Sequence, residues 1–292
     1  MQSEARGMLS MRDTFEEFCS RLLDNVGPEN AVRLNYLRCH WRFPNLRNPR
    51  RFSEKVQFRK LYGDQPLFAR LADKLLVKDF VAETAGPDLV IPTVWSGTTL
   101  PPIRERSWPL PFVIKANHGS GRNRFVRTEE DLDWEGIEAE CTKWIATDYK
   151  RYLGERWYNR IDRKLLVEPV IGENLRDYKF FVFDGTVKFI EVDTDRFSRH
   201  KRCFYDSQWN RLEFSLGYPL ETKPIERPIH LSAMLDVAQK LASGFDFVRV
   251  DLYDLEPGPK FSELTFTPDS GHKRFRPDRY DYIVGGLWHQ AR

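Results

Sequence analysis

The 292-residue chain is long enough to bury a large core in one domain or in several lobes, and its 46 basic and 43 acidic residues leave a net charge of +3. No apolar run approaches the roughly 20 residues that span a bilayer, and residues 1–18 lack the apolar core of a secretory signal. The four cysteines show no CxxC or paired spacing, so a disulfide scaffold and a membrane-spanning protein are excluded and a cytoplasmic location is expected.

Helical patterns dominate residues 1–85. Segment 53–63 begins at Ser53, a favourable N-cap residue, and ends at Gly63. Segment 66–86 has a mixed apolar and basic helical spacing and also ends at a glycine. The sequence therefore predicts a helical N-terminal region.

The pattern changes at about residue 88. Segments 88–95 and 111–116 are short β-branched runs bounded by proline or glycine, which predict strands. Segment 128–152 follows, with a threonine cap, an acidic first turn and apolar residues at helical spacing, which predict a helix. Segment 164–172 predicts a further strand.

The C-terminal half predicts two hairpins. Segment 178–192 would turn at Asp184-Gly185, a dipeptide typical of two-residue hairpin loops. Segment 245–266 would turn around Pro257-Gly258, and segment 231–244 between them predicts a helix. Helices that alternate with mainly antiparallel hairpins predict an α+β fold with more than one lobe.

Polar residues inside the second hairpin indicate a site. Strand alternation places Arg249 and Asp251 on one face, and Glu263 would lie across from Asp251. Two adjacent carboxylates repel and need a cation, a proton or an arginine between them, and Mg²⁺ uses one or two such ligands. The alternative is a structural Arg249–Glu263 ion pair with Asp251 exposed.

Lys115 closes a predicted strand and precedes a glycine-containing loop. An ammonium group beside glycine-rich backbone N–H donors suits nucleotide phosphates, although neither GxxxxGK[ST] nor GxGxxG is present. The alternative is a lysine at a sheet edge followed by a surface turn.

The order of these features resembles the ATP-grasp superfamily, and more specifically the TupA-like ATP-grasp family, named for teichuronopeptide biosynthesis. The resemblance extends from about residue 51 to 283 and rests on the phrases "FSEKVQFRKLY", "LADKLLVKDFV", "FVIKANHGSG", "DYKFFVFDG", "FIEVDTDRFSRHKRCFYD", "FDFVRVDLYD" and "FSELTFTPDSG".

The resemblance implies an ATP-grasp fold in which two α+β lobes enclose ATP. It divides the chain into residues 1–85, a helical region and the start of the N-terminal lobe, residues 86–165, a lobe with the glycine loop, and residues 166–292, a lobe with the metal site. The positions that match the family's ATP contacts are Lys74, Lys115, Gly119, Ser120, Gly121, Glu168, Val170 and Asp177. Among these, the two lysines and the loop would contact phosphates, Glu168 and Val170 the adenine, and Asp177 the ribose.

The resemblance also assigns Mg²⁺ ligands to Asp251, Glu263 and Thr265. Thr265 stands where many ATP-grasp enzymes have asparagine, which puts a second Mg²⁺ in doubt. Arg249 would stabilise charge on the transferred phosphoryl group, with the structural ion pair as its alternative. Lys179 is a further candidate catalytic residue, and its alternative is a salt bridge to Asp177.

The basic segment 193–206 includes Arg196, the third candidate catalytic residue. It would bind an acidic sugar or cover the phosphates, and its alternative is a solvated loop. No HxH or HExxH motif indicates a transition metal.

The implied activity is an ADP-forming carboxylate–amine ligase. It would join a uronic acid carboxyl group of a cell-surface polysaccharide, or of its precursor, to an amino acid or amine through an acyl phosphate. The implied partners are that amine and an acidic glycan, with contact to polysaccharide assembly enzymes and no nucleic acid. Alternatives are a sugar kinase or glycosyltransferase, and a non-catalytic binding module.

Overall fold

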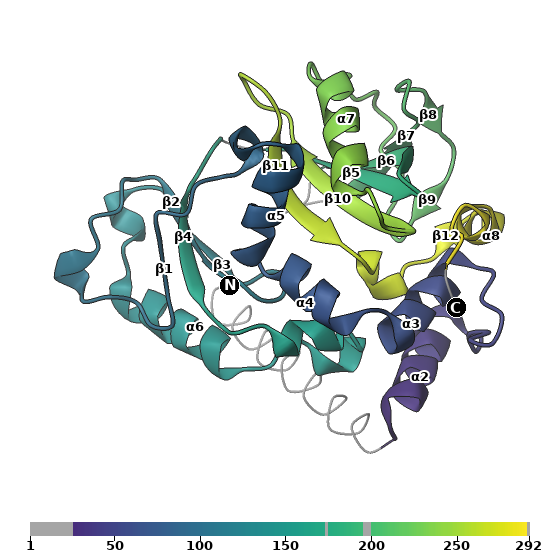
Figure 1. Ribbon diagram of the computed structural model, residues 1–292, viewed down its shortest axis with the longest axis horizontal. Helices are drawn as coiled ribbons and strands as arrows, with labels where there is room; N and C mark the ends of the chain where they lie inside the picture. Colours follow the sequence, from purple (N-terminus) through teal and green to yellow (C-terminus); the bar gives the residue numbers. More distant parts are fainter. Residues whose placement is uncertain (1–25, 173–174, 195–199, 291–292) are drawn as a thin grey trace.

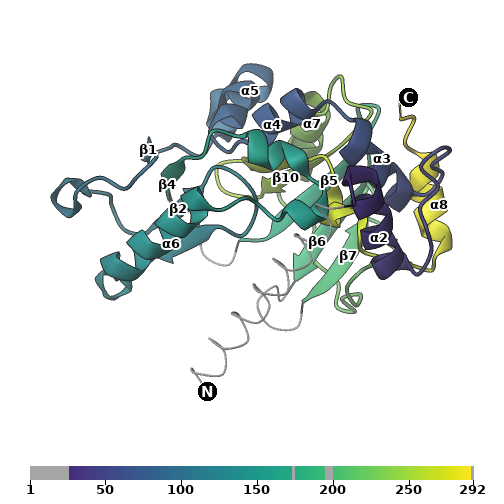
Figure 2. The same ribbon diagram turned by 90° about the horizontal axis from the view of Figure 1, so that it is seen from below.

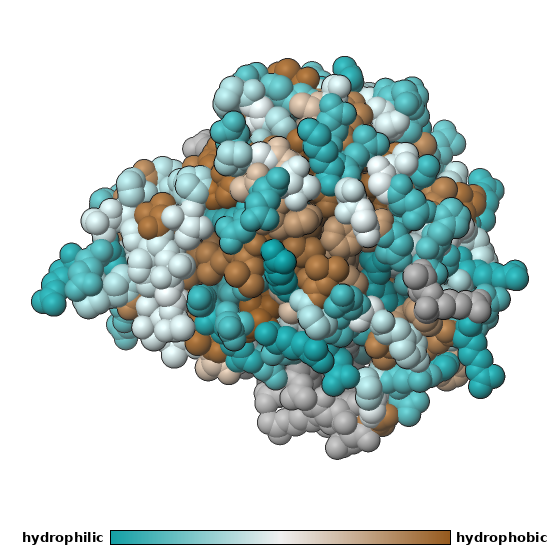
Figure 3. Space-filling view, in the orientation of Figure 1, coloured by the Kyte–Doolittle hydropathy of each residue, from teal (hydrophilic) through white to brown (hydrophobic). Residues whose placement is uncertain are grey.

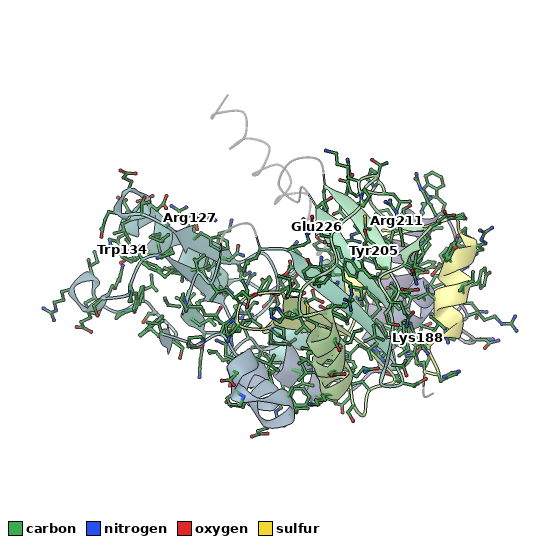
Figure 4. The ribbon with its side chains drawn as sticks, turned by 90° about the horizontal axis from the view of Figure 1, so that it is seen from above. Arg127, Trp134, Lys188, Tyr205, Arg211 and Glu226 are labelled. Carbon is green, nitrogen blue, oxygen red and sulfur yellow. The ribbon has the colours of Figure 1, made fainter. Side chains whose placement is uncertain are left out.

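The computed structural model describes residues 26–172, 175–194 and 200–290, and within them the two larger antiparallel sheets lie in separate lobes (Figure 1). The α+β class expected from the sequence is therefore confirmed. Seen from above, Arg127 and Trp134 lie on the smaller lobe, whereas Lys188, Tyr205 and Arg211 lie on the larger one (Figure 4). The division into residues 1–85, 86–165 and 166–292 remains a prediction.

The smaller lobe contains a four-stranded sheet in the order β1-β4-β2-β3. Its strands are β1 (Trp95–Gly97), β2 (Phe112–Ala116), β3 (Asn123–Val126) and β4 (Leu165–Pro169). Helix α6 (Trp134–Ala146) packs Ile137 and Cys141 into an apolar core with the sheet. The predicted helix from residue 128 is shorter than expected, because Asp133 caps α6 and Thr128 instead begins a 3-10 turn (Glu129–Asp131).

The larger lobe contains a six-stranded sheet in the order β11-β10-β5-β6-β7-β8. Its strands are β5 (Asp177–Phe183), β6 (Thr186–Thr194), β7 (Lys201–Tyr205), β8 (Arg211–Leu212), β10 (Phe247–Tyr253) and β11 (Lys260–Thr265). Both predicted hairpins are confirmed as the antiparallel pairs β5–β6 and β10–β11. At the first turn, Asp184 and Gly185 have φ values of 45° and 72°, as a hairpin turn with two left-handed residues requires.

The two faces of the larger sheet have different environments. Helix α7 (Leu231–Leu241) covers one face and buries Leu231 and Met234 against it. On the other face, α3 (Phe52–Tyr62) and α8 (Arg279–Gly286) enclose an aromatic core around Phe52.

Helix α3 does not begin as predicted. Arg51 is its N-cap residue, and Ser53 lies inside the helix, where its hydroxyl donates to Asp281 Oδ2 at 2.6 Å. Glu54 accepts hydrogen bonds from the backbone N–H groups of Arg50 and Arg51, which completes the helix start. The preceding helix α2 (Pro28–His40) packs on α3 (Figure 2).

The single helix predicted over 66–86 is two helices, α4 (Gln65–Ala72) and α5 (Leu76–Ala85). They are broken at Asp73, whose carboxylate accepts the backbone N–H of Leu75 at 2.8 Å and so starts α5. In the space-filling view, apolar residues gather over α4 and α5 between the lobes (Figure 3).

Two further features complete the fold. Strand β9 (Ser215–Leu216) pairs with β12 (Phe275–Arg276), and a strained 3-10 turn, η6 (Pro268–Gly271), follows β11. Other 3-10 turns are Pro87–Leu89, Ile103–Glu105, Arg151–Leu153 and Arg156–Arg160. No helix among the described residues has the length and apolar character needed to cross a bilayer.

Candidate active site

A cleft of about 190 Å³ lies between the lobes. From the smaller lobe, helix α5 and the break before that helix, it is lined by Lys74, Lys78, Lys115, Ser120, Gly121 and Glu168. From the larger sheet it is lined by Asp177, Asp251, Tyr253, Phe261, Ser262 and Glu263. Residues far apart in the sequence therefore face one space, with three lysines and Glu168 on one side and three carboxylates on the other.

Lys74 occupies the break between α4 and α5. Its backbone N–H donates to Asn117 O at 3.0 Å, while the Asp73 carboxylate accepts the Asn117 side-chain amide at 3.0 Å. These contacts fix the lysine beside the glycine loop, and its ammonium donates to Gly119 O at 2.5 Å. Burial lowers the pKa of Lys74 to about 8, although nearby Glu263 acts in the opposite direction.

Lys115 is not at a sheet edge, since β2 lies between β4 and β3. Its ammonium lies 2.6 Å from Glu168 Oε2, and Lys78 lies 2.5 Å from Oε1 of the same carboxylate. Burial alone would raise the pKa of Glu168, but the two ammonium groups outweigh it and hold the pKa below its usual value. Three lysines therefore converge on this side of the cleft.

The glycine loop, residues 119–121, is held in place by residues outside the segment 112–121 from which it was predicted. Gly119 and Gly121 have φ values of 75° and 77°, and a Cβ on Gly119 would lie 2.2 Å from the Tyr149 ring. Arg122 donates to Trp144 O at 2.9 Å and to Asp148 O at 3.0 Å, at and beyond the end of α6. Glycine is thus required at residue 119 both for its backbone conformation and for its close approach to Tyr149.

His118 is a buried neighbour of this loop. Its Nε2 lies 2.5 Å from Arg122 Nη1, and its Nδ1 lies 3.2 Å from Asn117 Oδ1. Burial, followed by the positive charges of Arg122, Arg163 and Lys74, lowers the pKa of His118 to about 4. The imidazole is therefore neutral at physiological pH and links Arg122 to the loop.

The free energy of unfolding should consequently fall as pH drops from about 6.5 toward 4. Because the pKa of His118 is lower in the folded state, the unfolded chain binds more protons in this window, and stability is lost as pH falls through it. His118→Asn should remove this contribution, which is at most about 3 kcal/mol. Denaturant unfolding of both proteins at a series of pH values measures the difference. Parallel curves would contradict this role.

The predicted carboxylate pair is confirmed as a geometric arrangement. Asp251 and Glu263 are direct register partners on β10 and β11. Arg249 donates to Asp251 Oδ1 at 2.7 Å and Oδ2 at 2.6 Å, and to Glu263 Oε1 at 2.8 Å. The ion pair proposed as the alternative is thus present, but Asp251 is buried with only 2% exposed, not solvent-facing as that alternative required.

The electrostatics of this pair are asymmetric. Burial raises the pKa of Asp251 to about 7, with Arg249 opposing and Glu263 adding to the rise. For Glu263, burial also acts upward, but Arg249 and Lys74 outweigh it and lower the pKa. The Thr265 hydroxyl donates to Glu263 Oε1 at 3.0 Å. Two carboxylates and a hydroxyl are hard oxygen donors, which fit Mg²⁺ with the remaining ligands supplied by water or phosphate.

Among the residues that the structure describes, no group of three or more His, Cys, Asp or Glu side chains is placed to hold a metal ion. A site on Asp251 and Glu263 is therefore of the type that completes its coordination from outside the protein. That type is common for Mg²⁺ at phosphate-binding sites.

Lys179 is next to Asp251 by register but pairs elsewhere. Its ammonium contacts Asp193 and lies 3.6 Å from Glu191 on β6. The salt bridge to Asp177 proposed as its alternative is not the pairing that the structure gives this lysine. Together, Glu263, Asp251, Lys179 and Glu191 form a continuous row across four strands, here called the charged row.

The remaining predicted residues have different positions. Asp177 lines the cleft, whereas Val170 is not among the lining residues, and its backbone N–H donates to Pro111 O at 3.0 Å. Arg196 lies outside the described residues. Sequence reasoning missed Lys78 and Arg122. Lys78 lies four residues after Lys74, one helical turn away, which was the available signal.

Solved structures that resemble the chain include D-alanine–D-alanine ligase from Bacillus anthracis complexed with ATP, with 16% identity and a TM-score of 0.39 over 67% of this chain and 55% of that one. N5-carboxyaminoimidazole synthetase from Staphylococcus aureus complexed with ADP has 14% identity and a TM-score of 0.40 over 67% and 43%. The ATP-grasp ligase PsnB complexed with minimal precursor, Mg and ADP has 13% identity and a TM-score of 0.37 over 75% and 60%. The chain spans about half the length of these proteins.

No curated protein sequence matches the chain. The family model described as TupA-like ATPgrasp matches residues 54–289, which is most of the chain and includes every described residue of the cleft. This match confirms the resemblance found in the sequence phrases. The chain belongs to the TupA-like ATP-grasp family.

Proposed function

We propose that this protein is an ATP- and Mg²⁺-dependent, ADP-forming ligase that joins a carboxylate to an amine. The observation that carries the proposal is the single cleft in which Lys74, Lys78 and Lys115 face Asp251 and Glu263. Lysine ammonium groups suit the phosphates of ATP, and paired carboxylates suit a metal that bridges those phosphates.

The cleft also offers a place for the nucleoside. Val77, Val90, Ile91 and Phe261 give part of its lining an apolar character suited to an adenine ring. Asp177 is the register partner of Tyr253 and lines the same cleft. Its carboxylate is therefore placed to accept a hydrogen bond from a ribose hydroxyl. In this orientation the phosphates extend toward the lysines and the Gly119–Gly121 loop.

Asp251 and Glu263 would hold Mg²⁺, with the Thr265 hydroxyl as a weak neighbour. Bound there, the ion would neutralise charge on the phosphates of ATP. Arg249 has its guanidinium between the same two carboxylates, so it is placed to stabilise negative charge on the transferred phosphoryl group. The Lys74 and Lys115 ammonium groups would orient the phosphates, and the Arg122-held loop would exclude water.

The reaction proceeds in two balanced steps. A carboxylate oxygen of the acceptor attacks the γ-phosphorus of ATP and displaces ADP, which gives an acyl phosphate. The neutral amine then attacks the carbonyl carbon, phosphate leaves with one former carboxylate oxygen, and the nitrogen loses a proton. Positioning and charge stabilisation account for this chemistry without a protein nucleophile.

We propose a uronic acid of a cell-surface polysaccharide, or of its precursor, as the carboxylate, and an amino acid or small amine as the nucleophile. The family, named for teichuronopeptide biosynthesis, supports this substrate class.

An isotope experiment tests this reaction. Uronic acid oligosaccharides labelled with ¹⁸O in the carboxylate are incubated with ATP, Mg²⁺ and a panel of amino acids, and the products are read by mass spectrometry. We expect equal amounts of ADP, phosphate and amide, with one ¹⁸O in each phosphate. Carboxyl-reduced oligosaccharides of the same length are the control and should give no stimulation of ADP release. A phosphorylated sugar without free phosphate would instead identify a kinase, and consumption of a sugar nucleotide without ATP a glycosyltransferase.

A further inference from the structure

A line of cations and aromatic rings leads from the surface near α2 to the charged row. It consists of Trp41, Arg274, Lys273, Tyr218 and His200, here called the basic track. None of these residues lines the cleft, and of the five only His200 lies in the basic segment 193–206 that the sequence singled out.

The outer end of the basic track is an exposed tryptophan. Trp41 is 81% exposed and has a left-handed φ of 58°, so core packing does not account for it. The Arg274 guanidinium lies 4.1 Å from the centre of its ring and donates to Cys39 O at 2.5 Å. One face of the indole is therefore covered by a cation, and the ring is held in place with most of its surface accessible.

The pairing of β9 with β12 joins this end to the inner end. Gly217 N–H donates to Arg274 O at 3.1 Å, which brings Lys273 beside Tyr218. The Lys273 ammonium lies 4.3 Å from the centre of the Tyr218 ring, and the His200 ring lies 3.8 Å from it. Gly217, with φ of 72°, permits this contact, because a Cβ there would lie 2.4 Å from Lys273 Cδ.

The inner end reaches the active site through Arg202. Its guanidinium lies 4.7 Å from the Tyr218 ring centre and 2.7 Å from Asp193 Oδ1. Asp193 in turn contacts Lys179, the register partner of Asp251. These three connecting side chains are buried, so they fix the position of Tyr218 relative to the charged row.

The cations at the outer end of the basic track are uncompensated, whereas His200 Nε2 at its inner end lies 2.8 Å from Asp193 Oδ1. Arg202 has acidic partners in Asp193 and Asp269. Within the described part of the chain, Lys273, Arg274 and the neighbouring Arg276 have no ion pair with an acidic side chain. Unpaired cations on neighbouring residues attract a ligand with repeated negative charges.

We propose that the basic track binds an acidic polysaccharide chain and directs its end toward the cleft. Sugar carboxylates would pair with Arg274 and Lys273, and a sugar ring would stack on the accessible face of Trp41. The choice of an acidic glycan rests on the proposed function. An anionic membrane fits less well, because the two rings alternate with cations along a line and do not form a continuous apolar patch.

The test uses the full chain and a polygalacturonate oligomer of about ten residues, with affinity measured by calorimetry. Trp41→Ala and, separately, Lys273→Gln should each weaken oligomer binding about tenfold, which corresponds to about 1.4 kcal/mol. Neither should change ATP affinity or the binding of monomeric galacturonate. The affinity of the wild-type protein should fall with salt, and Lys273→Gln should reduce this dependence.

Phe125 and Arg127 provide a matched control. They form a second exposed aromatic–cation pair, with the guanidinium 4.9 Å from the ring, on the smaller lobe (Figure 4). Phe125→Ala should leave oligomer binding unchanged. Equal oligomer affinity in the wild-type protein and both track variants would overturn the proposal, as would binding to phosphatidylglycerol vesicles with no binding to the oligomer.

This experiment separates the inference from the proposed function. Loss of oligomer binding in the track variants, in a protein that forms no amide, would support the basic track and reject the ligase reaction. Amide formation on long uronic acid chains with unchanged KM in both variants would support the reaction and reject the basic track.

Discussion

Asp251→Asn should reduce Mg²⁺-dependent turnover about a thousandfold or more. The substitution preserves the shape of the side chain but removes one of two anionic ligands from the proposed metal site, and such an ion supplies several kcal/mol of charge stabilisation. Both Asp251 oxygens also accept from Arg249, so the variant loses the group that orients this guanidinium. Steady-state rates of ADP release with saturating ATP and graded Mg²⁺ measure the effect.

Loss of folding has to be separated from loss of chemistry in this experiment. Asp251 is buried, and weakening its ion pair with Arg249 costs stability. Glu263→Gln is the second variant, because the Glu263 side chain is 46% exposed and contributes less to the fold. Thr265→Ala, which removes only a hydroxyl beside Glu263, is the control and should retain most activity. Wild-type rates at limiting Mg²⁺ in both carboxylate variants would show that the pair is structural.

The hairpins could be predicted because their turns carry local information. Asp184-Gly185 adopts the two positive φ values that the dipeptide favours, and strand alternation then fixes which residues share a face. The same reasoning placed Asp251 opposite Glu263, which the register confirms. Sequence alone was sufficient here because neighbours in space are also close in the chain.

The prediction of the helices was wrong where residues distant in the sequence contribute to the local structure. The spacing over 66–86 is continuous, yet the helix breaks at Asp73, whose carboxylate caps α5 locally and also accepts the side-chain amide of Asn117 from the loop after β2. This break is what places Lys74 against Gly119. The ATP-contacting role of Lys74 was expected from the family phrases, but no periodicity could predict the geometry.

The hydrogen-bond and ion-pair partners of buried charged residues also could not be predicted from the sequence. Lys179 was paired with Asp177 because both lie on one strand face, but its partners come from the adjacent β6. Likewise, Arg122 follows the glycine loop directly, yet its carbonyl acceptors lie at and beyond the end of α6. A charged residue within a strand indicates a functional site from the sequence alone. Its ion-pair partner, however, depends on the order of strands in the sheet.

Helices α2 and α3 illustrate the same limit. The sequence assigned no role to residues 1–50, but the structure shows α2 packed on α3, which in turn packs against α8 and the turn η6 that follows β11. Buried Lys60 on α3 donates to Ser270 O at 2.6 Å in that turn. The N-terminal helices therefore support the segment after Glu263, a contact between opposite ends of the chain.

Lys115→Met should weaken ATP binding by about 10- to 100-fold while leaving adenosine binding unchanged. A hydrogen bond to a charged group contributes about 1.5–3 kcal/mol to binding. Adenosine has no phosphates, so its binding does not depend on this contact. Lys74→Met should behave in the same way, because its ammonium lies at the glycine loop. Calorimetry with ATP and adenosine on each variant gives the two affinities directly.

Two further lysines distinguish a phosphate contact from a general charge effect. Lys188 is exposed on β6, on the larger lobe, and Lys188→Met should bind ATP as the wild-type protein does (Figure 4). Lys78 shares the Glu168 carboxylate with Lys115, so Lys78→Met disrupts the same ion-pair group. Equal losses of ATP and adenosine affinity in Lys115→Met and Lys78→Met would mean that freeing Glu168 distorts the nucleoside end of the cleft. A loss confined to ATP would assign the Lys115 ammonium to the phosphates, and unchanged ATP affinity in both Lys74→Met and Lys115→Met would reject the nucleotide site proposed for this cleft.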